Sequence, residues 1–498
     1  MPEAPILAAP CSPGHLPLPK TKNGLQPMRM LIAGQWVESE NTIPVRDPYD
    51  DSVIDYVPNA STEDARRALD AAERGFETSR KLTAFERARI LYRTAETVSD
   101  RSEDFATLIA MEGSKTIREA RKEVSRCVNT LTVSAEEAKR VGGETIPFDS
   151  FPGGEHRVGY YYRAPMGVVL AITPFNDPLN LVAHKLGPAI AAGNSLILKP
   201  ATATPLSALK LAESLLEAGL PADVLQVITG SGAALGAVLV PDERIRMISL
   251  TGGMEAGRQV ARLAGIKKIG MELGSNSPVI VWADAEMEWA VESCVSGAFW
   301  AAGQNCIGVQ RLYVHEAVYE AFREAFVERT RAYRIGDKLR EETDMGPMIT
   351  EGEATRVERW IAEAAAAGAT VLCGGGRTRA LVEPTVLEGV PETATLHREE
   401  VFGPTVNLYR ISDVDEAISK ANSLPLGLHA AVFTSDIDLA FKMAYAIDCG
   451  GVMINDSTDY RLDSMPFGGI KHSGLGREGI PFAVEEMTET KVVCVNLR

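Results

Sequence analysis

One cysteine lies in a local context that suits a reactive thiol. Cys306 belongs to Gly303-Gln304-Asn305-Cys306-Ile307-Gly308, where two glycines indicate a tight turn directly after an expected helix. Most cysteines are buried as small apolar residues, but a thiol on a polar turn can form the nucleophilic thiolate. The glycine and polar neighbours therefore favour a nucleophile at this position.

Two further side chains could assist such a nucleophile. Glu272 ends an expected buried strand, where a carboxylate is either ion-paired or a base with a raised pKa. Asn176 lies just past another strand, where its amide could donate to a developing oxyanion. The spacing of these residues alone does not show that they meet Cys306.

Two glycine-rich turns could bind phosphate. The segment Gly230–Gly236 follows an expected strand and opens a helix, and it contains Gly232 and Gly236. Thr251-Gly252-Gly253 occupies the same kind of position after the next strand. Either helix start could present backbone N–H groups to a pyrophosphate, although glycine-rich turns of this kind are common.

The elements that must position these residues alternate between short apolar runs and helical segments. Buried parallel strands are expected at 168–173, 195–198, 224–228, 247–250 and 268–271, with helices between them. This alternation predicts a doubly wound α/β sheet, which binds nucleotides at the carboxyl ends of its strands.

A second α/β unit is expected after residue 275. Its helices are expected at 286–301, 316–334 and 351–367, and its strands at 311–314, 370–373 and 406–409. The alternating terminal stretch 490–495 could pair with an extended stretch at 157–163.

Composition limits the class of protein. The chain has 498 residues, too many for one core, and a formal net charge of −16, which argues against nucleic-acid binding. Seven scattered cysteines form no metal-binding or redox pair, so we expect no metal and a reducing cytoplasm. No apolar run is long enough to cross a membrane, and residues 1–28 are expected to form a disordered arm.

Six segments resemble the aldehyde dehydrogenase superfamily, in that family's order and rough spacing. They are Pro174-Phe175-Asn176, Leu198-Lys199-Pro200, Met271-Glu272-Leu273-Gly274, Gly303-Gln304-Asn305-Cys306, Glu399-Glu400-Val401-Phe402-Gly403-Pro404 and Pro466-Phe467-Gly468-Gly469.

The resemblance implies an organisation of the whole chain. It implies a Rossmann-type nucleotide-binding domain (29–145 and 164–274), an α/β catalytic domain (275–480) and a β-strand oligomerisation arm (146–163 with 481–498). A homodimer or homotetramer would follow.

The resemblance also assigns catalytic roles. Cys306 would attack the aldehyde, and the Asn176 amide with the Cys306 N–H would stabilise the oxyanion. Glu272 would activate the water that hydrolyses the thioester. Lys185 and Glu478 match positions implicated in proton relay. The presence of Glu272 argues against transfer of the acyl group to a thiol, and the presence of both Cys306 and Glu272 argues against a catalytically silent relative.

The same resemblance assigns cofactor contacts. Lys199 and Glu400 would hold the two riboses, Phe402 would pack beside the nicotinamide, and Gly253 would meet the pyrophosphate. Thr202 stands where many NAD-specific members have a glutamate, so NADP is permitted and either NAD or NADP remains possible. The expected cofactor-binding set is completed by Gly232, Gly236, Thr251 and Gly252.

Two arginines are candidates for choosing the aldehyde. Arg126 and Arg461 match positions where members that oxidise carboxylate, phosphate or phosphonate aldehydes often have arginine, which could hold an anion by paired hydrogen bonds. Each could equally be paired with a nearby acid. Asn305 before the nucleophile would also face the substrate, and Asp177 would repel an anion unless it faces away.

We therefore expect a small polar or acidic aldehyde. The region 454–467 resembles lactaldehyde and semialdehyde dehydrogenases, and phosphonoacetaldehyde dehydrogenases are a further similarity. A bulky neutral aldehyde is the alternative.

Overall fold

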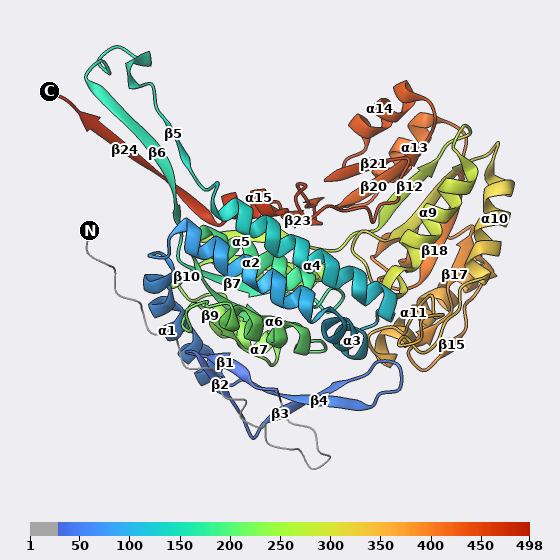
Figure 1. Cartoon of the computed structure of the whole chain (residues 1–498). Helices are drawn as coiled ribbons and strands as arrows, with labels where there is room; N and C mark the ends of the chain where they lie inside the picture. Colours follow the sequence, from blue (N-terminus) through green and yellow to red (C-terminus); the bar gives the residue numbers. More distant parts are fainter. Residues whose placement is uncertain (1–27) are drawn as a thin grey trace.

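A computed structural model describes residues 28–498 (Figure 1). The expected N-terminal arm falls almost entirely outside these residues. Within the described part, no helix is long and apolar enough to span a bilayer. The α/β fold expected from the sequence is confirmed: two large sheets, each covered by helices, lie side by side, and a thin β arm projects from the body (Figure 1).

The first large sheet has the strand order β2-β1-β9-β8-β7-β10-β11-β23. Its five central strands are parallel and correspond to the five strands expected from the sequence. Their bounds are β7 Val168–Ile172, β8 Ser195–Lys199, β9 Leu225–Val227, β10 Ile245–Thr251 and β11 Lys268–Glu272. The edges are antiparallel, formed by β1 (Met30–Ile32) and β2 (Gln35–Val37) on one side and β23 (Gly474–Leu475) on the other.

The connection between β9 and β10 creates a switch point in this sheet. The chain runs outward from β7 through β8 to β9, and then returns to place β10 on the other side of β7. The loops after β7 and β10 therefore diverge and leave a crevice at the carboxyl ends of these strands, which is where open α/β sheets bind ligands. Helices cover both faces of the sheet: α1 Thr62–Ser79, α2 Ala84–Asp100, α3 Ser102–Glu112, α4 Ile117–Ala138, α5 Asn180–Ala192, α6 Leu206–Glu217, α7 Gly232–Leu239 and α8 Met254–Leu263.

Helix α4 begins at a capping box, and this capping box also contacts the unit that contains the second large sheet. The Thr116 hydroxyl accepts from the N–H of Glu119, and the Glu119 carboxylate accepts from the N–H of Thr116. The same Glu119 carboxylate accepts from the N–H of Ala301, which precedes Cys306. The helix that carries Arg126 is thus anchored directly to the turn that carries Cys306.

The second large sheet has the order β14-β17-β18-β13-β12-β20-β21. It is parallel except for β14 at one edge. Its strands are β12 Ser277–Val281, β13 Val309–His315, β14 Thr370–Cys373, β17 Thr385–Glu388, β18 Thr405–Ile411, β20 His429–Phe433 and β21 Gly451–Ile454, and its main helices are α9 Met287–Phe299, α10 Tyr319–Arg331, α11 Glu351–Ala366, α13 Val414–Ala421 and α14 Ile437–Ala446. Short strands and a helical turn complete it: β15 Arg377–Thr378, β16 Leu381–Val382, α12 Thr395–Arg398, β19 Leu426–Gly427 and β22 Ile470–Lys471.

One helix is shorter than the sequence predicts. We expected a helix over 286–301, but α9 ends at Phe299. Ala301 and Ala302 have φ angles of 49° and 56°, so they lie in the left-handed region and cannot continue the helix. Alanine gives no sequence signal for this conformation. The resulting turn directs the following segment, which includes Cys306, away from the axis of α9.

The arm consists of three antiparallel strands. The terminal strand β24 (Thr488–Asn496) pairs along its whole length with β6 (Arg157–Pro165), which confirms the pairing expected from the sequence. A short strand β5 (Gly143–Thr145) adds to the other edge of β6, and the 3-10 turn η1 (Phe148–Ser150) follows it. Helix α15 (Ile480–Glu486) precedes β24 and contacts α4 and α5 at the base of the arm.

A β hairpin joins the two large units on the side away from the arm. Strands β3 (Thr42–Arg46) and β4 (Val53–Pro58) form this hairpin (Figure 1). The buried Lys338 ammonium of the second unit lies 2.8 Å from the Asp47 carboxylate next to the hairpin, and donates to the carbonyls of Met111 and Gly113. A buried cation with three oxygen partners fixes the relative position of the two units.

Candidate active site

A cleft of about 540 Å³ lies between the two units at the switch point. It brings together most residues that the sequence singled out, although they are far apart in the chain. From the carboxyl end of β7 come Thr173, Pro174, Phe175 and Asn176, from β10 come Thr251, Gly252 and Gly253, from β11 comes Glu272, and from the second unit come Cys306, Glu400 and Phe402.

Cys306 lies on the turn after α9, partly buried. Gly303 in this turn has a φ of 69°, and a side chain there would overlap the carbonyl of Gly403, so the turn requires glycine. Burial, with the nearby Glu400 carboxylate as a second cause, raises the pKa of the Cys306 thiol to about 12. The thiol is therefore protonated at neutral pH, and its reaction needs a base.

Glu272 lines the same cleft and has the properties of that base. Burial and the nearby Glu478 carboxylate raise the pKa of Glu272 well above its usual value. Its Oε2 atom is buried and has no hydrogen-bond partner among the described residues. A carboxylate that is not held by donors can accept a proton from a reacting group.

Glu478 is linked to two cations beside Glu272. Lys185 donates to Glu478 Oε1 over 2.8 Å, and Arg461 donates to Oε2 over 3.1 Å. Burial alone would raise the pKa of Glu478, but the charges of Lys185 and Arg461 outweigh it and hold the pKa below its usual range. Thr251 also donates to Glu478, so this carboxylate stays ionised within a connected polar network.

The cleft has features that fit a dinucleotide. Helix α8 starts at Gly253 with no side-chain cap, so its first N–H groups are free to bind a pyrophosphate. The hydroxyl of Thr173 is buried in the cleft wall with no partner among the described residues. The Glu400 carboxylate lies against Gly274, where a side chain would overlap it, and accepts from the N–H of Ser275. Phe402 packs edge-on against Phe175, with ring centroids 5.6 Å apart.

The other expected cofactor residues form a group at the ends of β8 and β9. Lys199 donates to the Thr202 hydroxyl over 3.1 Å, and Thr202 donates to the carbonyl of Gly230. Gly232 opens α7 beside them, and Gly236 lies one turn further along that helix. Burial lowers the pKa of Lys199 to about 8, and no carboxylate of residues 28–498 pairs with it. An unpaired cation here suits a phosphate or ribose oxygen.

A smaller cavity of about 190 Å³ opens on the other side of Cys306. Arg126, Arg461, Asn176 and Asn305, all expected at the substrate site, line it together with Cys306. Asn305 accepts from the N–H of Ile307 and stabilises the turn as well. The cavity is thus a pocket at the reacting thiol that shares Asn176, Leu181 and Cys306 with the cofactor cleft.

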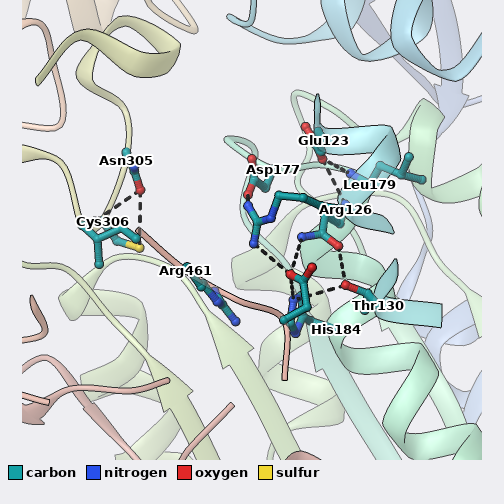
Figure 2. A network of polar contacts seen from close by, with 12 residues as sticks. Glu123, Arg126, Thr130, Asp177, Leu179, His184, Asn305, Cys306 and Arg461 are labelled. Atoms are coloured by element: carbon teal, nitrogen blue, oxygen red, sulfur yellow. Dashed lines mark hydrogen bonds and ion pairs between the residues drawn. The ribbon is translucent and has the colours of Figure 1, made fainter. Parts of the chain in front are cut away.

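Both arginines line this pocket and are also ion-paired, Arg461 with Glu478 and Arg126 with acids that include the Asp177 drawn beside it in Figure 2. Arg126 donates to Asp463 over 3.0 Å and lies 3.5 Å from Asp177. Asp177 is in addition paired with the buried Lys115, so its charge is neutralised although it lines the pocket. The sequence left two interpretations of each arginine open: an anchor for an anionic substrate, or a residue paired with a nearby acid. The structure has features of both, because each arginine lines the substrate pocket and each is ion-paired.

Three charged or aromatic residues of this pocket were not expected from the sequence, Lys122, Trp300 and Asp459, and neither were the apolar Leu181 and Ala301. Lys122 is one helical turn before Arg126 on α4, and this spacing could have placed both on one face. Nothing in the sequence marks Trp300 or Asp459, because their position depends on how α9 and the 455–465 loop pack.

The whole chain matches known proteins with this architecture. Residues 36–493 match the aldehyde dehydrogenase family. The chain belongs to this family. It is 51% identical to aspartate-semialdehyde dehydrogenase 1 from Pseudomonas canavaninivorans, over 92% of this chain and 97% of that protein.

Solved structures of the family agree. Aldehyde dehydrogenase 21 from Physcomitrella patens, in complex with the reaction product succinate, has a TM-score of 0.93 and 38% identity, covering 95% of this chain and 99% of that one. A glyceraldehyde-3-phosphate dehydrogenase from Methanocaldococcus jannaschii, complexed with NADP, has a TM-score of 0.89 and 39% identity, covering 92% and 100%. The chain is thus an oxidoreductase that converts an aldehyde to its acid with NAD or NADP.

Proposed function

We propose that the protein oxidises a small acidic aldehyde, with Cys306 as nucleophile, Glu272 as base and Asn176 in the oxyanion site. The observation that carries this proposal is the pocket at Cys306, which is small and presents the N–H donors of Lys122, Arg126 and Arg461. The carboxylates of Asp177 and Asp459 also line it, and that of Asp177 is paired with Lys115. A short aldehyde with a carboxylate or phosphate at its far end matches these donors.

The chemistry begins at the thiol. Because the pKa of Cys306 is about 12, its proton must leave as sulfur attacks the carbonyl carbon, and Glu272 lines the same cleft as its acceptor. The thiohemiacetal oxyanion accepts hydrogen bonds from the Asn176 amide and the Cys306 N–H. The Asn176 side chain donates to no described residue, so it is free for this task.

A nicotinamide dinucleotide bound in the cleft would supply the hydride acceptor, so that loss of hydride from the thiohemiacetal would give a thioester on Cys306. The proton taken from Cys306 must leave Glu272 before hydrolysis, and the hydrogen-bonded pair Lys185 and Glu478 lies near Glu272 to receive it. Glu272 then takes a proton from the water that attacks the thioester carbonyl and returns it to the departing sulfur, which releases the acid and restores the thiol. Thr173, Gly253, Glu400, Phe402, Lys199 and Thr202 would hold the dinucleotide.

The relatives support the substrate class. The names of the compared proteins refer to aspartate semialdehyde, succinate and glyceraldehyde 3-phosphate, all of which are acidic. The neutralisation of Asp177 by Lys115 and Arg126 removes the repulsion that an anion would otherwise meet.

Steady-state kinetics test this proposal. The purified protein is assayed for reduced-cofactor formation with NAD and NADP on 4-oxobutanoate and on butanal, which differ in the carboxylate. We expect a lower KM for 4-oxobutanoate than for butanal, and Arg126→Ala should raise the KM for 4-oxobutanoate but not that for butanal. Arg461→Ala should raise the same KM, and it should also change kcat for both aldehydes because Arg461 holds Glu478 beside Glu272. Arg121→Ala is the matched control, because Arg121 lies on the same helix but pairs with Glu103 at the surface. A preference for butanal over 4-oxobutanoate would favour the alternative substrate class, a neutral aldehyde that is bulky. No turnover of any aldehyde would favour a catalytically silent protein.

We also propose that the arm assembles the protein as a homodimer or homotetramer. Val158 and Tyr160 on β6 and Val495 on β24 are exposed apolar residues on a two-faced strand pair that contacts little of its own body.

The six described cysteines are free thiols, which supports the expected cytoplasmic location.

A further inference from the structure

Three buried ionisable residues at the start of α4 take no part in the proposed chemistry. Lys115, Glu119 and Glu123 are 2%, 6% and 1% exposed. They are spaced by four residues: Lys115 lies just before the N-cap residue, and Glu119 and Glu123 lie on one face of the first two helical turns. Burial of a charge costs free energy unless it is paired and hydrogen-bonded, so the partners of these side chains show what they hold.

Glu123 holds the end of the loop that carries Asn176. This loop runs from β7 to α5, and α5 has no side-chain cap of its own. The Glu123 carboxylate of α4 supplies the cap instead (Figure 2): its Oε1 accepts from the N–H of Leu179 over 2.8 Å and from the N–H of Asn180 over 3.0 Å. A carboxylate is also the charge that a helix N-terminus favours.

Lys115 joins this cap to the middle of the loop. Its ammonium donates to Glu123 Oε2 over 2.8 Å and also to the carboxylate of Asp177, the residue that follows Asn176. The Asn176 side chain lines both cavities and has no hydrogen bond to another described side chain. Its direction is therefore set by the neighbours that Lys115 and Glu123 hold.

The same face of α4 also holds the turn that carries Cys306. Glu119 Oε1 accepts from the N–H of Ala301 over 2.9 Å. The Lys115 ammonium lies 5.9 Å from the centre of the ring of Trp300, which directly precedes Ala301. One short stretch of α4 thus contacts both loops of the active site, although these loops come from different units of the protein.

We propose that Lys115 and Glu123 are positioning residues that direct the Asn176 amide toward the oxyanion site, relative to the Cys306 turn that the same helix holds. This inference rests on the proposed function, in which the Asn176 amide and the Cys306 N–H donate to one oxyanion. Two such donors act together only if both point at the same oxygen, and a misplacement of about 1 Å can lower a rate by about 10²-fold. Because the oxyanion exists only during the reaction, loss of positioning should lower the rate rather than the affinity for the aldehyde.

The rate of the first turnover tests this inference, because it does not include release of the reduced cofactor. Reduced-cofactor formation is followed by stopped flow with saturating cofactor and increasing concentrations of 4-oxobutanoate or butanal. Rates are normalised to the folded fraction measured by circular dichroism. Butanal reports on positioning alone, since it has no charge that responds to the loss of a cation beside Asp177.

Two variants release the loop. In Lys115→Met and Glu123→Gln, we expect the maximal rate to fall by about tenfold to 10²-fold for both aldehydes. The butanal concentration that gives half of this rate should change less than about twofold. Arg118→Met is the control and should keep the wild-type rate: it breaks an ion pair of α4 with Asp344, and Arg118 lines neither cavity.

A cycle of double variants shows whether the effect passes through Asn176. Asn176→Ala alone should lower the maximal rate by about 10²- to 10³-fold. Adding Glu123→Gln to Asn176→Ala should lower it less than about threefold further, since no amide is left to position, whereas independent effects would multiply. Asp177→Ala leaves the buried pair of Lys115 and Glu123 intact and releases only the loop, so it decides the question if the other variants do not fold. It should lower the maximal rate for butanal about threefold or more.

Wild-type maximal rates in Glu123→Gln and Asp177→Ala would overturn the inference. Losses that multiply with the loss in Asn176→Ala would also overturn it, as would a change confined to the half-saturating concentration of butanal. In each of these results Asn176→Ala still loses activity, so the proposed function survives. If Asn176→Ala keeps the wild-type rate, the oxyanion role of Asn176 fails first and the inference fails with it.

Discussion

Lys185 and Glu478 form a buried ion pair, with Nζ 2.8 Å from Oε1, directly beside Glu272. The pair keeps a negative charge next to the candidate base, and that charge adds to burial in raising the pKa of Glu272. Burial is the larger cause of the raised pKa of Glu272, and the second is the charge of Glu478, which Lys185 and Arg461 hold ionised.

This arrangement predicts a pH dependence. Glu272 must be ionised to accept a proton, so kcat should rise with pH as its raised pKa is passed. Glu478→Gln removes the negative charge, lowers the pKa of Glu272 and should move the rising limb of the kcat profile to lower pH. Glu489→Gln on the arm should leave the limb in place. A limb that stays fixed or moves upward in Glu478→Gln would refute this coupling.

Replacement of Glu272 should slow both halves of the reaction, because Glu272 takes the proton of Cys306 and later a proton of water. In Glu272→Gln, steady-state turnover should fall by about 10²- to 10⁴-fold, since hydrolysis loses its base. Intact mass measurement of the variant after mixing with aldehyde and cofactor should show slow formation of an acyl adduct, which then persists because no base activates water. Full turnover in this variant would exclude Glu272 from the hydrolytic step.

The contact between Lys199 and Thr202 predicts cofactor choice. Thr202→Glu places a carboxylate beside the Lys199 ammonium, where it can bind a ribose hydroxyl but repels a 2′-phosphate. We expect kcat/KM for NADP to fall at least about tenfold while that for NAD is retained. Thr202→Ser keeps the hydroxyl and should leave both values unchanged. An equal loss for both cofactors would show that this position does not discriminate between them.

Lys338 should be a main contributor to the stability of the two-unit body. Lys338→Met removes the partner of the Asp47 carboxylate and of two buried carbonyls, and should lower the free energy of unfolding by about 3–5 kcal/mol in urea titration. Lys442→Met breaks a surface pair with Asp415 and should cost at most about 0.5 kcal/mol. Similar losses for the two variants would contradict the assignment.

Assembly through the arm predicts a change of mass. Val158→Lys combined with Tyr160→Lys places charges on the exposed face of β6 and should convert the oligomer to a monomer in sedimentation experiments. Glu73→Lys, on the exposed surface of α1, should not. An unchanged mass in the double variant would show that another surface holds the subunits together.

The sequence was sufficient to predict the parallel strands of the first sheet, since each is a short apolar run between helical segments. It also predicted that β24 pairs with β6. It could not predict that α9 stops at Phe299, because the left-handed Ala301 is held by a hydrogen bond from its N–H to the distant Glu119. The ion pairs of the pocket could not be predicted either, since Arg126 pairs with Asp463, which is remote in sequence.

The central claim is that Cys306 is the nucleophile, and its replacement is the most direct test. Reduced-cofactor formation is measured for Cys306→Ala with an acidic aldehyde, next to Cys449→Ala, which removes another partly buried thiol outside both cavities. We expect Cys306→Ala to lose about 10³-fold or more of kcat, and Cys449→Ala to keep wild-type turnover. Wild-type turnover by Cys306→Ala would contradict the mechanism.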